Sequence, residues 1–517
     1  MTKLTNDLKA HLEKNHDRQI LKEVALNRWF TGAEVEEDIQ RFGQLLDAAN
    51  FGRDDLVFMG LNNTAAFLPI NQALWRRGVT AHPVSGATPI AELTADYQAH
   101  HYAGIVATKE QAEAFADYQE LAQVPINLAT NPDLVFLYRT DLEAGRPNTP
   151  TEDSYGWIMN TSGTTGKPKH VGLTHEMMRR AAQYDLESHK LTADDTVLVV
   201  MPMFHINAQE LIINSTLLSD GRIVIAPKFS ASRFWTWINE NDATWSSVVP
   251  TIVTILLKNE KSRLAFDPNH HLRFVRCASA MLPLNRHKAF VEAFKVPILE
   301  GWGMTEACSQ CTLNPLDAIK LGSVGKPYHT EVMVYKDGKY TNEVGVTGEL
   351  VIRGDHVIHG YLDKNRNQDF YDGWFHTGDL GYFDEDGYLW LQGRIKHVIN
   401  RGGEKVSPII VENVLSQLDF VANVAVVPTP DDLYGEAVTA AIIPSETMVG
   451  SESFMRQKID ELAQKSLPKY RQPTKVFFVD AFPLNPTGKI MREKLSEQLV
   501  AIERGDLDEK ESSVAVS

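Results

Sequence analysis

A glycine-rich loop near residue 165 carries the densest group of side chains suited to holding phosphate. A short apolar run that starts at Gly156 leads into it. Two glycines free the backbone, so that consecutive N–H groups can point into one hollow. Hydroxyls and lysines surround those amides and add further hydrogen-bond donors. The residues predicted to bind a polyphosphate are Thr161, Ser162, Gly163, Thr164, Thr165, Gly166, Lys167 and Lys169.

This loop is not a Walker A loop. In that motif a glycine would stand at position 161, which is Thr, and a hydroxyl residue would stand at Pro168. A plain surface turn is the competing interpretation, because Gly, Ser and Thr commonly cluster in turns. The strand-like lead-in and the two lysines favour phosphate binding.

A second loop, which follows an apolar strand, combines an aromatic ring with oxygen ligands. Glycines beside an aromatic ring suit a surface on which a planar base stacks. Thr305 and Glu306 supply oxygens, and Mg²⁺ prefers few carboxylates together with substrate phosphates. A strand-to-helix turn with Glu306 in its first helical turn explains the segment equally well. The residues of this candidate site are Gly301, Trp302, Gly303, Met304, Thr305 and Glu306.

Other polar positions are weak candidates when taken singly. Asp379, in the segment His376–Asp379, is suited to holding the two hydroxyls of a ribose, although Gly-Asp by itself favours a turn. His205 follows an apolar strand, where a single histidine is more often packed than catalytic. Lys489 lies in a turn near the C-terminus, where a lysine is normally solvated. The loop Arg401–Lys405 either lines a channel or connects a strand to a helix.

Metal and redox motifs are poorly supported. The three cysteines are Cys277, Cys308 and Cys311, a sparse and odd number that argues against a disulfide framework and favours a reducing compartment. Cys308 and Cys311 match C-x-x-C, but zinc needs two more ligands and only Cys277 remains, so we expect buried or half-buried thiols. The acidic run Asp384–Gly387 predicts a hairpin turn, because the Glu of a calcium loop would fall on Gly393.

The composition is that of a large, acidic globular protein. The 517 residues contain 51 Lys and Arg against 67 Asp and Glu, a net charge of −16 with histidine neutral. This balance argues against nucleic-acid binding, while leaving room for a local basic pocket. No apolar stretch fits a secretory signal or approaches the roughly 20 residues of a spanning helix. We therefore expect a cytoplasmic protein without a membrane span.

Rigid elements must position these loops. The first half alternates β-rich runs with helical stretches, which predicts α/β architecture with largely parallel sheets. Short strands and Gly/Asp turns then predict a β-rich subdomain over about residues 322–394, and a small α+β unit follows. The predicted domains are residues 1–394 and 395–500, with a polar tail at 501–517.

Local sequence patterns predict individual strands and helices. In the first half the predicted strands are Leu56–Met59, Gly104–Thr108, Thr196–Pro202 and Arg222–Pro227, and the predicted helices are Pro89–His100 and Ser230–Asn241. In the C-terminal unit the predicted helices are Pro408–Gln417 and Ser451–Ser466, and the predicted strands are Val421–Pro428, Ala437–Pro444 and Lys475–Val479.

Taken together, the motifs resemble the adenylate-forming superfamily of acyl-CoA synthetases. The matching segments are TSGTTGKPK at 161–169, FH at 204–205, GWGMTE at 301–306, HTGD at 376–379, GR at 393–394, RGGEK at 401–405 and PTGK at 486–489. The similarity spans about Asp55 to Lys494, and such an ordered set is not expected by chance.

The resemblance implies a fold and a reaction. A large N-terminal domain of two α/β sheets plus the β-rich subdomain would be capped by a mobile C-terminal domain. A carboxylic acid and ATP would give acyl-AMP and pyrophosphate, and CoA would then displace AMP to give the thioester. ATP, Mg²⁺ and CoA are the implied cofactors and co-substrates. Because two anions must meet, cations have to neutralise them.

The resemblance also implies roles for the nucleotide-binding positions. The loop at 161–169 would hold the β- and γ-phosphates. Glu306, with Thr164 or Thr165, would bind Mg²⁺. Gly301 and Trp302 would flank the adenine, where the family often has Tyr. The ribose would be held by Asp379 and Arg394.

Further implied roles concern the acyl group, CoA and domain movement. Lys489 would reach the α-phosphate and the carboxylate and stabilise the charge that develops in adenylation. His205 would gate the acyl pocket, and Gly402 and Gly403 would border the pantetheine path. Lys396 matches the family's hinge position.

The acyl acid is less closely defined. The pocket is expected to draw on the segments His205–Gln209, Val249–Thr251, Cys277–Met281 and Trp302–Cys308, a mixture unlike a long apolar groove. The sequence is most similar to ligases for small organic acids, the oxalate–CoA ligase branch being the nearest. That branch tends to carry a second His where Asn207 stands. Oxalate is therefore one candidate beside other short or polar acids and medium-chain fatty acids.

Two other functions stay open. One is an adenylation protein that loads a separate carrier, although no phosphopantetheine-attachment segment is visible in the tail. The other is a nucleotide-binding regulator without turnover, which the presence of Lys489 and Glu306 disfavours, because binding alone does not need a late, mobile lysine. The expected partners are small molecules rather than nucleic acid, and a homodimer is an open option for the assembly.

Overall fold

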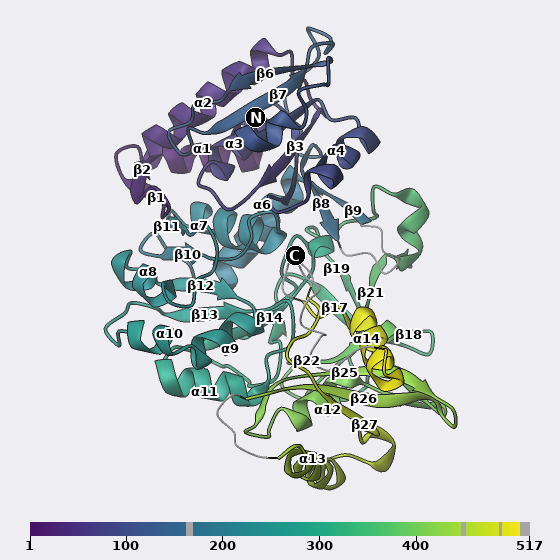
Figure 1. Ribbon diagram of the computed structural model, residues 1–517. Coiled ribbons are helices and arrows are strands. Elements are labelled where there is room, and N and C mark those ends of the chain that lie inside the picture. Colours follow the sequence, from purple (N-terminus) through teal and green to yellow (C-terminus); the bar gives the residue numbers. More distant parts are fainter. Residues whose placement is uncertain (162–168, 446–450, 485–488, 507–517) are drawn as a thin grey trace.

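The structure, a computed structural model, describes residues 1–161, 169–445, 451–484 and 489–506. Within these ranges the chain forms four β-sheets with helices packed around them (Figure 1). Two large sheets, one of seven and one of nine strands, form the body of the molecule. A six-stranded sheet and a five-stranded sheet follow in the second half. This arrangement confirms the predicted mixed α/β class with a large N-terminal and a smaller C-terminal domain.

The seven-stranded sheet carries the start of the glycine-rich loop. Its order is β6-β7-β5-β3-β4-β8-β9, with β3, β4, β5 and β8 parallel and the remaining pairs antiparallel. The central strand β3 is almost entirely buried, as expected for a continuous apolar run in a parallel sheet. The strands are β3 (Leu56–Leu61), β4 (Thr80–Ser85), β5 (Gly104–Thr108), β6 (Leu121–Pro125), β7 (Leu134–Arg139), β8 (Tyr155–Thr161) and β9 (Lys169–Thr174), and the helices are α2 (Gly32–Ala48), α3 (Phe67–Trp75), α4 (Ile90–Ala99) and α5 (Lys109–Glu113).

The nine-stranded sheet has the order β16-β15-β14-β13-β12-β10-β11-β1-β2 and is parallel from β14 to β1. Its strands are β1 (Gln19–Glu23), β2 (Arg28–Thr31), β10 (Thr196–Val199), β11 (Arg222–Ile225), β12 (Trp245–Val248), β13 (Phe274–Cys277), β14 (Ile298–Trp302), β15 (Thr312–Leu313) and β16 (Lys326–Pro327). Its helices are α1 (Lys3–Lys14), α6 (His175–Ser188), α7 (Ser215–Leu218), α8 (Phe234–Glu240), α9 (Pro250–Lys258), α10 (Glu260–Ala265) and α11 (Leu284–Phe294). Helix α6 lies between the two large sheets (Figure 1).

The β-rich region is an antiparallel sheet. Its strands are β17 (Glu331–Lys336), β18 (Lys339–Thr341), β19 (Gly348–Arg353), β20 (Phe370–Tyr371), β21 (Trp374–Phe383) and β22 (Leu389–Arg394), with the 3₁₀ segment η3 (Lys364–Asp369) before β20. The predicted hairpin turn at Asp384–Gly387 joins β21 to β22, and Gly387 has a φ of 75° there. A positive φ explains why this position is Gly.

The 3₁₀ turn η4 (Ile395–His397) follows β22 directly, and the elements of the smaller C-terminal part come after it. Its strands are β23 (Ile399–Arg401), β24 (Glu404–Val406), β25 (Val421–Asp431), β26 (Gly435–Pro444) and β27 (Lys475–Phe478), and its helices are α12 (Pro408–Leu415), α13 (Glu452–Ser466) and α14 (Arg492–Arg504), with the 3₁₀ segment η5 (Lys469–Arg471). Apolar side chains form a core on each face of this sheet.

Most boundaries lie close to the predicted ones, with two informative differences. The loop Arg401–Lys405 is the turn of the β23–β24 hairpin, so it does not connect a strand to a helix. Helix α14 continues through Ala501 to Arg504, because Leu495 and Leu499 are buried and hold it against the sheet. No helix among the described residues is long and apolar enough to cross a bilayer.

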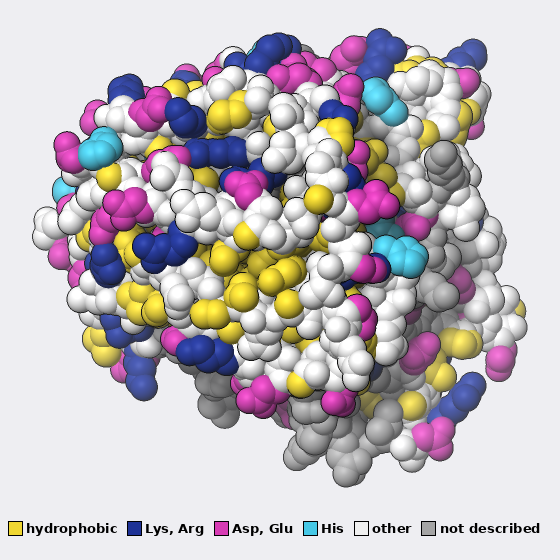
Figure 2. Space-filling view, turned by 90° about the horizontal axis from the view of Figure 1, so that it is seen from above, with side chains coloured by type: hydrophobic (Ala, Val, Ile, Leu, Met, Phe, Trp, Pro, Cys, Tyr) yellow, Lys and Arg dark blue, Asp and Glu magenta, His cyan; other side chains and the backbone are white. Residues whose placement is uncertain are grey.

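Surface charge is mixed. Figure 2 shows lysines and arginines interspersed with acidic side chains on the face that it draws, in keeping with the net charge of −16. A continuous basic surface, the expected feature of a nucleic-acid binder, is not what this face presents.

Candidate functional site

The carboxylate of Asp379 joins three segments that are distant in sequence. The Trp302 Nε1–H donates to Asp379 Oδ2 over 2.9 Å. The guanidinium Nε of Arg394 lies 2.7 Å from Asp379 Oδ1. Asp379 and Arg394 are direct cross-strand partners in β21 and β22, whereas Trp302 ends β14 of the nine-stranded sheet. Three of the predicted nucleotide-binding residues therefore meet at one buried carboxylate.

A bulge aims Asp379 at this point. The register between β19 and β21 shifts between Glu349 and Val351, where extra residues stand on β21. Gly378 has a φ of 71° in the bulge, and its N–H donates to Glu349 Oε1 over 3.0 Å. Such a bulge with a left-handed glycine turns the following side chain out of the regular alternation.

The loop after β14 is tightly folded. A Cβ on Gly303 would lie 1.8 Å from the Ser309 carbonyl oxygen, so only glycine fits. Cys308 and Ser309 have φ values of 50° and 120°, which residues with a side chain rarely adopt. The short 3₁₀ turn η2 (Thr305–Ala307) carries Glu306 between these constraints. Consecutive strained residues of this kind persist only where the surroundings enforce them, and they cluster at functional sites.

Glu306 and Lys169 meet at Tyr361. The Tyr361 hydroxyl donates to Glu306 Oε1 over 2.8 Å, and Lys169 Nζ lies 4.3 Å from the centre of the Tyr361 ring. Lys169 also forms an ion pair with Asp369 at 2.8 Å. Burial, and then the negative charge of Glu306, raise the pKa of Tyr361, which therefore stays protonated as a donor.

The glycine-rich loop is described only at its ends. Thr161 and Lys169 are paired across the antiparallel β8–β9 ladder. The other predicted phosphate-binding residues lie outside the described ranges: Ser162, Gly163, Thr164, Thr165, Gly166 and Lys167.

Lys489, near the C-terminus, lies within electrostatic reach of Asp379, Arg394 and Glu306. Lys489 is exposed as a residue, yet protein atoms surround its ammonium, and this burial lowers its pKa. The positive charge of Arg394 lowers that pKa further, whereas Asp379 and Glu306 act in the opposite direction. Lys489 in turn adds to the lowering of the pKa of His205 to about 4, for which burial is the main cause. The imidazole of His205 is therefore neutral at physiological pH.

The segment with His205 is held from the seven-stranded sheet. The side chain of Asn63 accepts from the Met203 N–H over 2.8 Å and donates to the carbonyls of Met201 and Ala226. A π-helix, η1 (Asn207–Asn214), follows His205. Wide turns of this type are often found at functional sites.

The remaining predicted positions lie in the C-terminal domain. Gly402 and Gly403 have φ values of 60° and 95° in the β23–β24 turn, and a Cβ on Gly402 would lie 2.9 Å from the Tyr434 ring. Lys396 lies in η4, where its ammonium is 3.9 Å from Glu493 of α14. No hydrogen bond within the described part of the chain joins the two glycines to Asp379.

Glu306 is the described residue that could contribute to binding a magnesium ion. The described residues include no group of three or more His, Cys, Asp or Glu that could hold a metal ion alone. Glu306 is largely buried, and one of its oxygens accepts from Tyr361. A single carboxylate beside a phosphate site fits Mg²⁺, which takes few protein ligands and keeps substrate oxygens and water.

Among the described residues, the three cysteines belong to no group of metal-ligating side chains. Cys277, Cys308 and Cys311 are buried free thiols, as expected. Burial raises the pKa of each thiol well above its ordinary value, so none is a thiolate.

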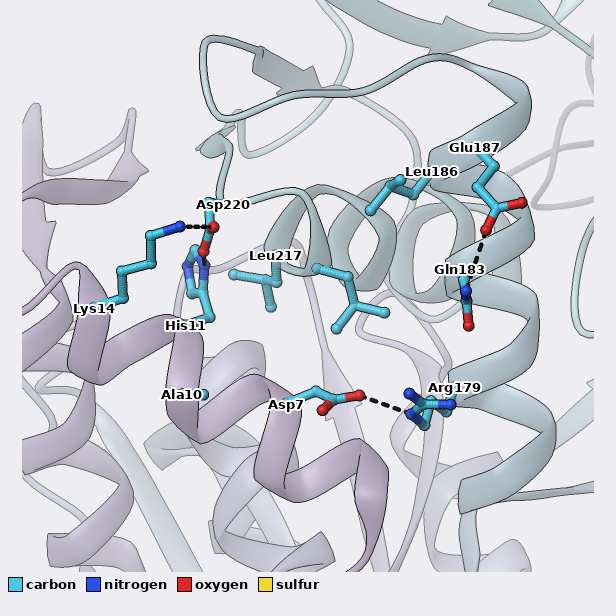
Figure 3. A pocket seen from close by; sticks show the side chains of 11 residues that line it. Asp7, Ala10, His11, Lys14, Arg179, Gln183, Leu186, Glu187, Leu217 and Asp220 are labelled. Carbon is cyan, nitrogen blue, oxygen red and sulfur yellow. Dashed lines mark hydrogen bonds and ion pairs between the residues drawn. The ribbon is translucent and has the colours of Figure 1, made fainter.

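A surface pocket of about 430 Å³ lies elsewhere, between α1, α6 and α7 (Figure 3). Its charged side chains pair with one another: Asp7 with Arg179, and Asp220 with both His11 and Lys14. None of the residues predicted for the site lines it.

Comparison with known families identifies the family of the chain. The model of the AMP-binding enzyme family matches residues 8–362, and that of the AMP-binding enzyme C-terminal domain matches residues 410–489. The chain belongs to the AMP-binding enzyme family. The predicted resemblance is thereby confirmed.

Relatives of this AMP-binding enzyme are CoA ligases. It is 34% identical to a probable CoA ligase of Humulus lupulus over 96% of this chain and 97% of the relative. It is 33% identical to the oxalate–CoA ligase of Arabidopsis thaliana over 91% of this chain and 93% of the relative. The crystal structure of ATP-bound MatB from Rhodopseudomonas palustris superposes with a TM-score of 0.83 at 25% identity, over 96% of this chain and 99% of that one. The predicted class, an ATP-dependent acid–thiol ligase, is confirmed.

Several residues that support the site escaped sequence reasoning. Tyr361 and Asp369, which contact Glu306 and Lys169, lie in no recognised motif. Asn63 belongs to a segment of weaker resemblance, and only the structure shows that it spans two sheets. An aromatic residue between two strands of the β-rich region was the only available signal for Tyr361.

Proposed function

We propose that this AMP-binding enzyme activates a small, polar carboxylic acid with ATP and transfers the acyl group to CoA at the site around Asp379. The acid's carboxylate oxygen attacks the α-phosphorus, and pyrophosphate leaves. The CoA thiol then attacks the acyl carbon, AMP leaves, and the thiol proton is released. The convergence of Trp302, Asp379 and Arg394, with Lys489 nearby, is the observation that carries the proposal.

The Asp379 group is proposed to hold the nucleoside. Each Asp379 oxygen accepts one protein donor and retains a lone pair for a ribose hydroxyl. Gly301 and Trp302, with Gly303, Met304 and Thr305 after them, would form the adenine surface. Because Trp302 is anchored through its indole N–H, its ring plane is held in place for stacking.

The phosphates are assigned to the glycine-rich loop and Lys169. Lys169 at present pairs with Asp369 and lies over Tyr361, so it has to exchange Asp369 for a phosphate oxygen. Glu306, with Thr164, is proposed to bind Mg²⁺. When bound, Mg²⁺ would neutralise phosphate charge and so aid attack by a second anion.

Lys489 is proposed as the residue that stabilises the adenylation transition state. Its ammonium interacts electrostatically with Asp379 and Glu306. A positive charge there would stabilise the negative charge that builds up as the carboxylate approaches the α-phosphate. The neutral His205 would border the acyl pocket and gate it. For CoA transfer, the C-terminal domain is proposed to rotate about Lys396 and bring Gly402 and Gly403 to the pantetheine path.

The acid is proposed to be small, with oxalate as one candidate. The names of curated relatives, an oxalate–CoA ligase and a sulfoacetate–CoA ligase of Cupriavidus necator that is 33% identical over 90% of this chain, support this size. Asn207 departs from the oxalate branch, so other short polar acids remain in the proposal. A cytoplasmic location, which the three free thiols support, and the domain limits at 394 and 500 are part of it.

Two measurements test this function. Pyrophosphate release is followed with ATP, Mg²⁺ and a panel of acids from two to sixteen carbons, including dicarboxylates. Turnover with a short polar acid is expected, and an absence of release with every acid would refute the enzyme and favour the nucleotide-binding regulator. AMP release that does not depend on CoA as acceptor would favour carrier loading instead.

A further inference from the structure

Strand β13 buries an arginine that has no partner for its charge. Arg276 is only 1% exposed, and its Nε and Nη1 have no hydrogen-bond partner. No carboxylate of the described chain lies within ion-pair distance of it. An arginine is effectively always charged, and even the burial that lowers its pKa leaves this one at about 10. Burying an unpaired charge is costly, so such an arrangement calls for a counter-charge that is absent from the protein itself.

Asp185, whose charge acts on Arg276, and other buried polar groups are also short of partners. Asp185 of α6 and Glu210 of η1 are buried and each leaves one carboxyl oxygen unpaired, as does the amide oxygen of Gln310. Burial raises the pKa of Asp185 to about 8 and that of Glu210 well above its ordinary range. Burial therefore works against a negative charge on either carboxyl, and neither forms an ion pair with Arg276 within the described part of the chain.

This buried cluster adjoins the proposed site. A Cβ built on Gly301 would lie 3.3 Å from Arg276 Nη2, and Gly301 directly precedes Trp302. Cys311 connects the two regions electrostatically: burial raises its pKa most, and Asp379, Glu306 and Asp185 all add to the effect. Arg276 also directly precedes the segment Cys277–Met281, which is expected to line the acyl pocket.

We propose that Arg276 binds a second anionic group of the acid, so that the preferred substrates are short dicarboxylates or equivalent dianions. This inference rests on the proposed function and names its substrate class. One carboxylate is activated by ATP, while the other supplies the counter-charge and accepts from the unpaired N–H groups of Arg276. The acid has to be short, because Arg276 lies only one strand from Trp302. Arg276 is then a specificity residue, and it takes no part in bond formation.

The wild-type enzyme gives the first test. KM and kcat are measured for oxalate, malonate and succinate and for the monocarboxylates acetate, propionate and butyrate. A preference of about 10- to 150-fold in kcat/KM for the dianion of a given length is expected, the range for a hydrogen bond to a charged group. Equal or better use of the monocarboxylates would overturn the role of Arg276 while leaving the ligase function intact. No turnover of any acid would overturn both.

The second test is Arg276→Met, which keeps the length and apolar stem of the side chain. The KM for the preferred dianion should rise about 10- to 150-fold, while the KM for ATP and the kcat/KM of the matching monocarboxylate stay within about threefold. A loss that is equal for both acids would mark Arg276 as structural and refute the proposal.

A matched control comes from the same segment. Arg273 forms an ion pair with Asp195 at 2.9 Å, and Arg273→Met should leave the dianion preference unchanged. If Arg276→Met does not fold, the wild-type comparison and Arg276→Lys decide. The lysine variant retains the charge and should retain the sign of the preference; reversal of that sign in a folded Lys variant would contradict the assignment.

Discussion

Asp379→Asn tests the centre of the site with almost no change in volume. In the native structure the Asp379 carboxylate accepts from Trp302 at 2.9 Å and from Arg394 at 2.7 Å. An asparagine has only one acceptor oxygen, so its NH₂ group has to face one of these two donors. At least one hydrogen bond to a charged group is lost, and such a bond contributes about 1.5–3 kcal/mol. Since each 1.4 kcal/mol is about tenfold, the KM for ATP should rise about 10- to 150-fold.

The C-terminal end of the same strand supplies a matched control. Asp384 accepts from Trp390 Nε1 at 2.7 Å and pairs with Lys320 at 2.7 Å, which repeats the tryptophan–aspartate–cation arrangement at a surface turn. Asp384→Asn should therefore lose the same kinds of interaction and lower stability, but leave nucleotide binding unchanged. ATP titrations of pyrophosphate release and thermal unfolding with and without ATP are run on both variants. An unchanged KM for ATP in Asp379→Asn, or an equal rise in Asp384→Asn, would show that the reasoning is wrong.

Three further predictions follow from the same geometry. Lys489→Ala should slow adenylation about 100-fold or more but keep thioester formation from supplied acyl-AMP within about threefold; equal loss of both steps in a stopped-flow comparison would contradict its role. Glu306→Ala should raise the Mg²⁺ concentration required for half-maximal activity, and an identical metal titration would remove Glu306 from the metal site. Burial opposes ionisation of Asp384, but hydrogen bonds from Lys320 and Trp390 outweigh it and lower its pKa from 3.8 to about 2. Because the unfolded chain takes up this proton first, the stabilising contribution is complete above about pH 4 and is lost as the pH falls toward 2; urea midpoints that move in parallel for wild type and Asp384→Asn over this range would speak against it.

Local patterns in the sequence predicted the elements well. The run Gly104–Thr108 forms β5 with the same limits, because a short apolar segment between polar ends has few alternatives. The turn at Asp384–Gly387 follows from its Asp and Gly content. In contrast, β10 ends at Val199 rather than Pro202, since the chain must leave the sheet for the segment that Asn63 holds.

Contacts between distant segments were beyond such reasoning. The motifs around Trp302 and Asp379 were recognisable, but their hydrogen bond depends on the bulge at Gly378, which no residue pattern specifies. Likewise Arg276 stands in an apolar strand, where sequence alone predicts a surface or edge position for a charged residue. Only the structure, in which Arg276 is 1% exposed, shows that its charge is buried.

Hydrogen bonds between the N-terminal and C-terminal parts of the chain bear on the proposed catalytic cycle. Under the proposed function, the electrostatic influence of Asp379 and Glu306 on Lys489 makes this the arrangement assigned to adenylation. Arg286 of α11 donates to the Val421 carbonyl at 2.8 Å and to that of Ala422 at 3.2 Å, and Ser407 donates to the Gln392 carbonyl. A net hydrogen bond is worth only about 0.5–1.5 kcal/mol, so a few such bonds hold the domain without locking it. In the proposed cycle, rotation for the CoA step would have to break them, so that departure of Lys489 from the site and loss of the Arg286 contacts would be parts of one movement about η4.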